Sequence, residues 1–409
     1  MLHLLNNKIE YKYEFCQQCG ACQAVCPKDA ISFASLDNGL KQICVDHNRC
    51  ILCKKCIRTC PANRSSATVD EYDSFLDEFH QKKFFLAWNS DPQVRNLSSS
   101  GGATKTIIIE SLKSGFVDGV YSLRKLDKYP SAIGAFYTRE NIPSYDDLPN
   151  SVYHSIMMCS EIAKVQKVHR LMLVGTSCQL YALERALKGM YDELVKVCIF
   201  CKQQKTLECT KWLGKVSGSK ISTKGDFAVE YRGHGWPGFV RINDNSIAWE
   251  RAAGLPFGRR LWIVPGCNIC GDPFGVEVNA DISVMDPWKI RPANSLGETL
   301  VSVHSDVGLQ LMRETTSLLV EEKNFSQVVD ALGLEDVWRK RACASYFGNG
   351  KFSSNIELAV KAELSQRKFF ERLLSFLPRL PFICFRALNK IVPSKRDAIL
   401  RYKDKKNDY

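Results

Sequence analysis

The sequence predicts a small cysteine-rich α+β unit followed by a larger α/β body and a basic helical tail. A four-cysteine motif occurs twice before residue 62, strands alternate with amphipathic helices from residue 83 onward, and basic residues gather after residue 366. Strand–helix alternation is typical of a sheet covered by helices. With 409 residues, 45% of them hydrophobic, the chain is long enough for two or three domains.

The cysteine-rich unit contains two copies of the pattern C-x2-C-x2-C-x3-C-P, which reads CQQCGACQAVCP over residues 16–27 and CILCKKCIRTCP over residues 50–61. Three closely spaced thiolates can reach three corners of a 4Fe-4S cluster, and the cysteine before proline ligates the cluster of the other half. The predicted ligands are therefore Cys16, Cys19, Cys22 and Cys60 for the first cluster, and Cys50, Cys53, Cys56 and Cys26 for the second.

A zinc module and a disulfide knot are the alternatives for this unit. Zinc sites favour two separated cysteine pairs and leave the third cysteine and the Cys-Pro of each copy unexplained. The opening residues, MLHLLNNKIEYKYEF, lack the pattern of an export signal, so we expect a cytoplasmic protein with reduced thiols. Strands at 30–33 and 43–45 would complete a bacterial-ferredoxin-like domain over residues 1–67. We expect a helix over residues 63–80 to connect this domain to the body, and we assign residues 68–83 as the linker between the two.

The body is predicted to contain strands at 84–88, 117–123, 132–138, 171–174 and 194–200, and helices at 104–114, 161–169 and 178–187. Gly115 is a typical helix stop. Two small-residue loops, Ser98 to Gly102 and Gly175 to Ser177, each precede a helix. Free N–H groups at such a helix start could bind a phosphate. The alternative for both loops is a turn that caps the helix.

A C-x-x-C pair lies at Cys267 and Cys270, between Pro265-Gly266 and Gly271-Asp272-Pro273. Two further cysteines, Cys178 and Cys201, follow strands whose ends should meet at one edge of a parallel sheet, so a third metal cluster is one interpretation. Core packing and a thioredoxin-like pair are the others. Cys198 competes with Cys201 as the ligand. The cysteines left for packing are Cys44, Cys159, Cys198, Cys209, Cys343 and Cys384.

Five segments occur in the order found in the family of coenzyme F420 hydrogenase/dehydrogenase beta subunits, which the chain resembles over residues 84–350. They are SSSGG, ESLKSGFVDGVYS, VGTSCQLYAL, YRGHGWPG and CNICGDPFGVEVNADISVMDPW. The resemblance divides the body into an N-terminal region, 84–165, and a C-terminal region, 166–350. The sequence departs from the family pattern at Ser177, where proline is usual, and at Met285, where glycine is usual.

The resemblance implies a flavin-binding body with FAD and a third 4Fe-4S cluster. The implied cluster ligands are Cys178, Cys201, Cys267 and Cys270. The implied FAD contacts are Ser99, Ser100, Gly101, Gly102 and Thr176 near the pyrophosphate, with Trp236 near the flavin or substrate. His234 and Arg232 are the implied catalytic residues. The alternative for these last three residues is a glycine-rich hairpin around a buried tryptophan.

The resemblance implies an iron–sulfur flavoprotein oxidoreductase, with reduced ferredoxin or the reduced deazaflavin coenzyme F420 as electron partner. F420 itself is a candidate substrate. Similar proteins with this ferredoxin fusion resemble enzymes of cell-surface polysaccharide synthesis, which suggests a small or lipid-linked substrate. The alternative is an electron-relay subunit of a larger hydrogenase or dehydrogenase complex, without a substrate of its own.

The net charge of +12 is uneven, because residues 367–409 contain 12 Lys or Arg against 4 Asp or Glu. This tail, predicted as residues 351–409, has two short helices broken at Pro378 and Pro381 and mixes basic with bulky apolar residues. Such a segment suits peripheral contact with the inner face of a membrane. The alternative is a helical hairpin packed on the body. A nucleic-acid-binding protein usually carries its basic residues in patches on the folded body, whereas here the excess lies in this terminal segment. The sequence contains no run of 18 apolar residues, so we expect no membrane span.

Overall fold

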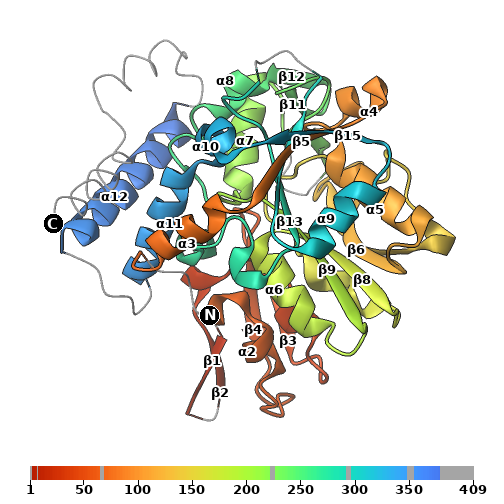
Figure 1. Cartoon of the computed structure of the whole chain (residues 1–409). Helices are drawn as coiled ribbons and strands as arrows, with labels where there is room; N and C mark the ends of the chain where they lie inside the picture. Colours follow the sequence, from red (N-terminus) through yellow and green to blue (C-terminus); the bar gives the residue numbers. More distant parts are fainter. Residues whose placement is uncertain are drawn as a thin grey trace.

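The structure is a computed structural model, and it describes residues 2–6, 8–64, 69–221, 226–291, 296–347 and 354–377. A small N-terminal unit lies against one end of a large body that is built around a central sheet (Figure 1). The predicted architecture, a small ferredoxin-like region followed by a larger body of helices and strands and by C-terminal helices, is confirmed. The helices of the body surround the sheet, and the long helix α12, Ser354–Phe376, lies on the outside.

The N-terminal unit consists of two hairpins and two short helices. One hairpin pairs β1, Leu2–Leu5, with β2, Lys8–Tyr11, and the other pairs β3, Ile31–Ser35, with β4, Lys41–Val45. The second hairpin contains both predicted strands. The helices α1, Ala21–Ala24, and α2, Lys55–Thr59, begin directly before the third cysteine of each motif.

The body contains an eight-stranded sheet whose strand order is β15-β5-β14-β13-β9-β8-β6-β7. The middle strands β13, β9, β8 and β6 are parallel, and the outer pairings are antiparallel, so the sheet is mixed. The strands span Leu318–Lys323 for β15, Lys83–Asn89 for β5, Thr299–Val303 for β14, Ile282–Met285 for β13, Glu193–Ile199 for β9, Arg170–Gly175 for β8, Gly119–Lys125 for β6 and Ala132–Thr138 for β7.

The parallel pairing of β8 and β9 brings the loops that follow them to the same edge of the sheet. Cys178 follows β8 at the start of the next helix, and Cys201 lies in the loop after β9. The sheet topology therefore positions two of the predicted third-cluster ligands together.

Alternating residues of the strands pack on opposite faces of the sheet, as the period of two requires. On one face, Met172 and Val174 of β8 pack with the helices α5, Ala103–Ser114, and α9, Asp306–Glu314. On the other face, Leu171 and Leu173 pack with α6, Ser177–Ala186. Both faces are thus covered by helices.

The face of the sheet that packs against α6 continues over β5 and β14, where four helices cover it. A buried cluster joins Phe84, Leu86 and Leu300 of these strands to aromatic and aliphatic side chains of the helices. The helices are α3, Tyr72–His80, α10, Phe325–Leu332, α11, Leu334–Phe347, and α12.

A second, smaller sheet lies beyond the end of the main sheet and forms its own buried cluster. Its antiparallel strands are β10, Val229–Glu230, β11, Phe239–Ile242, and β12, Asn245–Ala248. Three helices complete the body: α4, Pro92–Leu97, α7, Leu207–Ser217, and α8, Trp249–Ala253.

Two predicted helices differ from the structure. The helix predicted over 161–169 is wrong, because the chain forms a 3-10 helix over Met158–Lys164 and then leaves helical geometry. A backbone bond from Cys159 N–H to Cys19 O, 2.8 Å long, ties this segment to the N-terminal unit. Of the helix predicted over 63–80, the described residues form the helix Tyr72–His80, whose Tyr72, Phe75 and Phe79 are buried on the body.

The C-terminal tail is described only to Leu377, and the predicted segment beyond it lies outside the described residues. The first predicted tail helix is the end of α12, which stops at Phe376, before Pro378. Phe370 and Leu374 are fully buried on the body, whereas the side chain of Phe376 is 84% exposed. None of the helices in the described ranges is both long and apolar enough to cross a membrane.

Candidate iron–sulfur and flavin sites

Three hollows in the structure are each lined by four cysteines. The first, of about 420 Å³, is lined by Cys16, Cys19, Cys22 and Cys60. The second, of about 370 Å³, is lined by Cys26, Cys50, Cys53 and Cys56. In both, the cysteine before proline joins the three closely spaced cysteines of the other motif copy. The two motif copies are therefore interleaved in the way that a double 4Fe-4S unit requires.

The third hollow, of about 340 Å³, lies in the body and is lined by Cys178, Cys201, Cys267 and Cys270. Cys198 lies near these thiols but outside the lining. Its position on β9 directs it into the buried cluster on the α6 face of the sheet, where it lies against Gly275. The structure thus brings together the four residues that the resemblance implies and leaves Cys198 to packing.

The thiols surround hollows and do not converge on single-ion positions. Within the described residues, no group of three or more His, Cys, Asp or Glu side chains is arranged to hold one metal ion. The 17 cysteines in the described ranges are all free thiols, so the disulfide knot is not observed there. A hollow ringed by four thiols suits a cluster of several iron atoms better than one zinc ion.

Backbone and side-chain groups donate hydrogen bonds to the lining sulfurs. Cys16 Sγ accepts from the backbone N–H of Gln18 at 3.4 Å and from its side-chain Nε2 at 3.2 Å. Cys26 Sγ accepts from Ala30 N–H, and Cys267 Sγ from Gln204 N–H, both at 3.3 Å. Hydrogen bonds to ligating sulfur are one of the features that set the potential of an iron–sulfur cluster.

Burial keeps several of these thiols protonated in the absence of metal. It raises the pKa of Cys56 and of Cys60 to about 11, and that of Cys178 to about 12. Thiolate ligation therefore requires a positive metal centre to offset the buried charge, as coordination does for a metal-bound thiol.

The first and third hollows adjoin. Gln17 lines the third hollow as well as the first, and its Nε2 donates to Gly266 O at 3.4 Å. Gly266 N–H in turn donates to Cys16 O at 3.1 Å, and a Cβ on Gly266 would lie 2.3 Å from that oxygen. The glycine before Cys267 therefore allows the ligand loops of the two hollows to meet backbone to backbone.

Arg64 of the N-terminal unit extends to the third hollow. Its Nη1 donates to Ser177 Oγ at 3.0 Å and lies 3.7 Å from Asp272 Oδ2. Ser177 Oγ donates to the same carboxylate oxygen at 2.6 Å. Arg64 Nη2 also lies 3.9 Å from Cys270 Sγ. This buried network joins the two units beside the third set of cysteines, and sequence analysis missed it because no local pattern relates positions so distant in the chain.

Lys340 is a second residue of the third hollow that sequence analysis missed. It lies on α11, is 2% exposed, and lines the hollow directly. Its Nζ donates to Lys202 O at 2.7 Å. A buried cation facing four cysteines is suited to balance the negative charge of a thiolate-bound cluster.

The serine–glycine loop, residues 98–102, lies between β5 and the start of β14. Ser99 Oγ accepts from Ser151 N–H at 2.7 Å, and Ser100 donates to Glu298 O. A Cβ on Gly101 would lie 2.5 Å from Ala87 O, so close packing against the strands requires this glycine. Gly102 caps α5 in the left-handed conformation, and the first-turn N–H groups of α5 are the candidate donors to a phosphate here.

Thr176 does not share a site with that loop. It lines the third hollow, and its Oγ1 lies 3.3 Å from Cys178 Sγ. Strands β9, β13 and β14 separate β8 from β5, which puts the two loops about 19 Å apart at the usual strand spacing. The strand order therefore places Thr176 and Gly102 on separated loops, and a contact of both with one pyrophosphate stays a prediction.

Arg232 is fully bonded inside the protein. Its side chain is 0% exposed and forms a bidentate ion pair with Asp286, at 2.7 and 3.2 Å. The remaining donors bond to Pro237 O, Tyr153 Oη and Ser99 O. All five guanidinium N–H groups are thus occupied. Arg232 therefore holds the serine–glycine loop and the 231–238 hairpin in place. It has no N–H group left to donate to a substrate.

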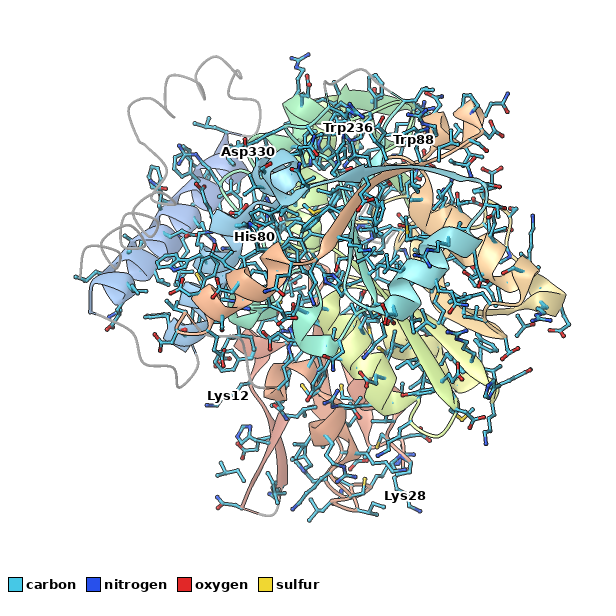
Figure 2. The ribbon with its side chains drawn as sticks, viewed as in Figure 1. Lys12, Lys28, His80, Trp88, Trp236 and Asp330 are labelled. Carbon is cyan, nitrogen blue, oxygen red and sulfur yellow. The ribbon has the colours of Figure 1, made fainter. Side chains whose placement is uncertain are left out.

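Trp236 and His234 lie on the same hairpin in different surroundings. Trp236 is buried, donates from Nε1 to Asp286 at 3.2 Å, and has its ring centroid 4.7 Å from that of Trp288. His234 is half-buried and has a left-handed φ of 62°. Partial burial, followed by the nearby Arg241, lowers its pKa. Trp236 lies on the side of the body opposite Lys28 of the N-terminal unit (Figure 2).

Three family models match successive parts of the chain. A 4Fe-4S dicluster domain matches residues 15–64. The N-terminal part of the coenzyme F420 hydrogenase/dehydrogenase beta subunit matches residues 84–142, and its C-terminal part matches residues 168–327.

A curated relative is a subunit of the F(420)H(2) dehydrogenase of Methanosarcina mazei, which is 22% identical over 196 residues. The match covers 46% of this chain and 52% of the relative, so the chain spans about half of that protein's length. A chain of the F420-reducing [NiFe] hydrogenase complex from Methanosarcina barkeri matches at a TM-score of 0.47 and 17% identity, over 67% of this chain and 97% of that one.

The matched ranges agree with the positions of the cysteine hollows, since the dicluster match contains the eight cysteines that line the first two hollows and the C-terminal match contains the four that line the third. The chain therefore belongs to the family of coenzyme F420 hydrogenase/dehydrogenase beta subunits and carries an N-terminal 4Fe-4S dicluster domain.

Proposed function

We propose that the protein is an iron–sulfur flavoprotein oxidoreductase that passes electrons between an external one-electron carrier and FAD through three 4Fe-4S clusters. The observation that supports this most strongly is the set of three four-cysteine hollows, two of which meet at Gln17 and Gly266. Clusters transfer single electrons. FAD supplies the change from one-electron to two-electron chemistry when it is bound.

The protein's residues have three roles in this proposal. Twelve cysteines hold the clusters, Gln17 and Arg64 fix the N-terminal unit against the body, and Arg232 holds the serine–glycine loop through Ser99. His234 is the candidate proton donor to a substrate, because its half-buried imidazole can exchange protons with solvent. FAD binding is proposed from family membership, with α5 as the phosphate-binding helix.

Coenzyme F420 is the proposed two-electron substrate, because the curated relative belongs to a dehydrogenase of reduced F420. A lipid-linked or small substrate of cell-surface polysaccharide synthesis is the other substrate class in this proposal. An anaerobic assay that follows the visible absorbance of F420 distinguishes the two substrate classes, because only an F420-dependent enzyme changes that absorbance. The variant His234→Ala tests the proton-donor role, and its flavin content should be unchanged.

A relay subunit without its own substrate is a second candidate function. The internal bonding of Arg232 favours it, because no guanidinium donor is left for an organic substrate. A stand-alone reductase turns over with a chemical electron donor, whereas a relay requires its partner protein before any turnover occurs.

Anaerobic purification followed by iron, sulfide and flavin analysis tests the proposal. About 12 iron atoms and one FAD per chain are expected, counting four iron atoms for each cluster. About 8 iron atoms without flavin would mean that only the N-terminal dicluster unit binds clusters, and would overturn the proposed electron-transfer path to FAD.

A further inference from the structure

The three hollows differ in how they relate to the body. The third is lined by body residues and Gln17, and the first is lined by the N-terminal unit and by Met157 of the body. The second is lined only by residues between Ile9 and Cys56 of the N-terminal unit. The second hollow is therefore the outermost of the three, and electrons that enter there have a route through the first to the third.

Five residues that line the second hollow are also exposed at the surface, and we call them the outer face: Pro27, Lys28, Ile51, Lys54 and Lys55. Lys28 lies at the end of the N-terminal unit that is farthest from the body (Figure 2). Ile51 lies between the ligands Cys50 and Cys53, and its side chain is 57% exposed. An apolar residue amid lysines is the usual composition of a small protein interface, with an apolar centre and a charged rim.

The charge of the outer face has one sign. Among the described residues that line the second hollow there are three lysines and no carboxylate. The nearby Asp29 is itself paired with Arg49 at 3.9 Å. A positive face over an electron-transfer centre raises the local concentration and association rate of a negatively charged partner.

We infer that the outer face is the docking site for a small acidic protein that carries one electron at a time. This inference rests on the proposed function and adds the place of entry and the kind of partner. In the step itself, the reduced carrier loses one electron and the cluster held by Cys26, Cys50, Cys53 and Cys56 gains it, without bond formation or proton transfer. Redox encounters of this kind use small interfaces.

The three lysines could instead serve only to balance the charge of the bound cluster. That role and docking predict different kinetics. Charge balance alone affects the cluster with every electron donor, whereas docking affects only a donor that must bind the outer face. A protein donor and a small cationic donor therefore separate the two roles.

The experiment compares a charge-reversed outer face, K28E/K54E/K55E, with the control K188E/K215E/K220E. The control reverses three exposed lysines of the body and so makes the same change in net charge. Each protein is mixed anaerobically with a reduced acidic double-4Fe-4S ferredoxin, and bleaching of the iron–sulfur absorbance is followed by stopped flow. The methyl viologen radical cation is the second donor.

We expect the second-order rate constant with ferredoxin to fall at least about tenfold in the outer-face variant at low salt, and the difference to shrink at high salt. We expect less than about a twofold change in the control. With methyl viologen we expect a smaller fall in the outer-face variant than with ferredoxin, because losing lysines beside the cluster affects every donor, whereas losing the docking site affects only ferredoxin. If the triple reversal reduces iron content, the neutral K28Q/K54Q/K55Q variant replaces it, with a smaller fall expected in the same direction.

Equal rates with ferredoxin in the outer-face variant and the control would overturn the docking inference, as would failure of ferredoxin to reduce a wild-type protein that methyl viologen reduces. Failure of methyl viologen to bleach the wild-type clusters would instead contradict the proposed function itself. The two failures are therefore distinguishable.

Discussion

The guanidinium of Arg64 lies 3.7 Å from the carboxylate of Asp272, and both side chains are buried, at 7% and 3% exposure. Arg64 belongs to the N-terminal unit, whereas Asp272 follows the C-x-x-C of the body. Because Ser177 Oγ bonds to both side chains, one small network holds three segments around the third hollow. A proline at position 177 could not form these bonds, because it has no hydroxyl group.

Replacing Arg64 with methionine is expected to destabilise the protein by about 3 kcal/mol or more, because it leaves Asp272 as an unpaired buried carboxylate. The free energy of unfolding in urea, measured anaerobically, gives the effect. Asp226→Asn is the control, since it breaks an exposed ion pair with Lys128 and should change stability little. Equal effects in the two variants would contradict a structural role for the buried pair.

Cys201 and Cys198 provide a matched pair of substitutions, since Cys198 lies near the end of β9 and Cys201 lies in the loop that follows it. Cys201→Ala is expected to lower the iron content from about 12 to about 8 atoms per chain, because Cys201 lines the third hollow. Cys198→Ala is expected to keep the full iron content and to lose only packing. Iron and sulfide analysis distinguishes them, and loss of iron in Cys198→Ala alone would reverse the assignment.

The ligand sets of the first two hollows follow from sequence alone, because the C-x2-C-x2-C-x3-C-P spacing determines which thiols can reach one cluster. The strands at 84–88, 132–138 and 171–174 were likewise predictable, since each is short, apolar and bounded by polar or turn residues. Cys178 and Cys201 could be placed at one edge because consecutive parallel strands commonly pair, as β8 and β9 do.

Strand order across the whole sheet could not be predicted in this way. Strands β13 and β14 come late in the chain but insert between β5 and β9. This insertion separates Thr176 from the serine–glycine loop, although both looked like phosphate loops in the sequence. The network of Arg64 and Asp272 escaped prediction for a similar reason, since it depends on docking of two units whose residues are about 200 positions apart.

Removing the buried cation of Lys340 is expected to make the third cluster harder to reduce. Lys340→Met should lower its midpoint potential by an amount on the order of 100 mV, since reduction adds a negative charge that the lysine stabilises. Potentiometric titration followed by EPR spectroscopy measures this shift. Lys188→Met, at an exposed position on the body, is the control, and equal shifts in the two variants would contradict the assignment of Lys340 to the cluster site.

His154 makes the stability of the body sensitive to acid. The imidazole is buried, with Nε2 2.8 Å from Pro130 O and Nδ1 2.8 Å from Tyr231 Oη. Burial lowers the pKa of His154 from 6.5 to about 4. The folded state therefore binds this proton less readily than the unfolded state, so the stabilisation is complete above about pH 6.5 and is lost as the pH falls toward 4.

For this one group, lowering the pH from about 7.5 to about 5 should reduce the free energy of unfolding by about 2 kcal/mol. His154→Gln keeps polar atoms near both partners but does not titrate. The variant should therefore show a shallower fall in stability over the same range. Comparing the two urea-unfolding series cancels contributions from other acid-sensitive groups, such as His304, whose pKa burial lowers to about 3. Parallel pH curves for the wild type and His154→Gln would show that His154 is not the group responsible.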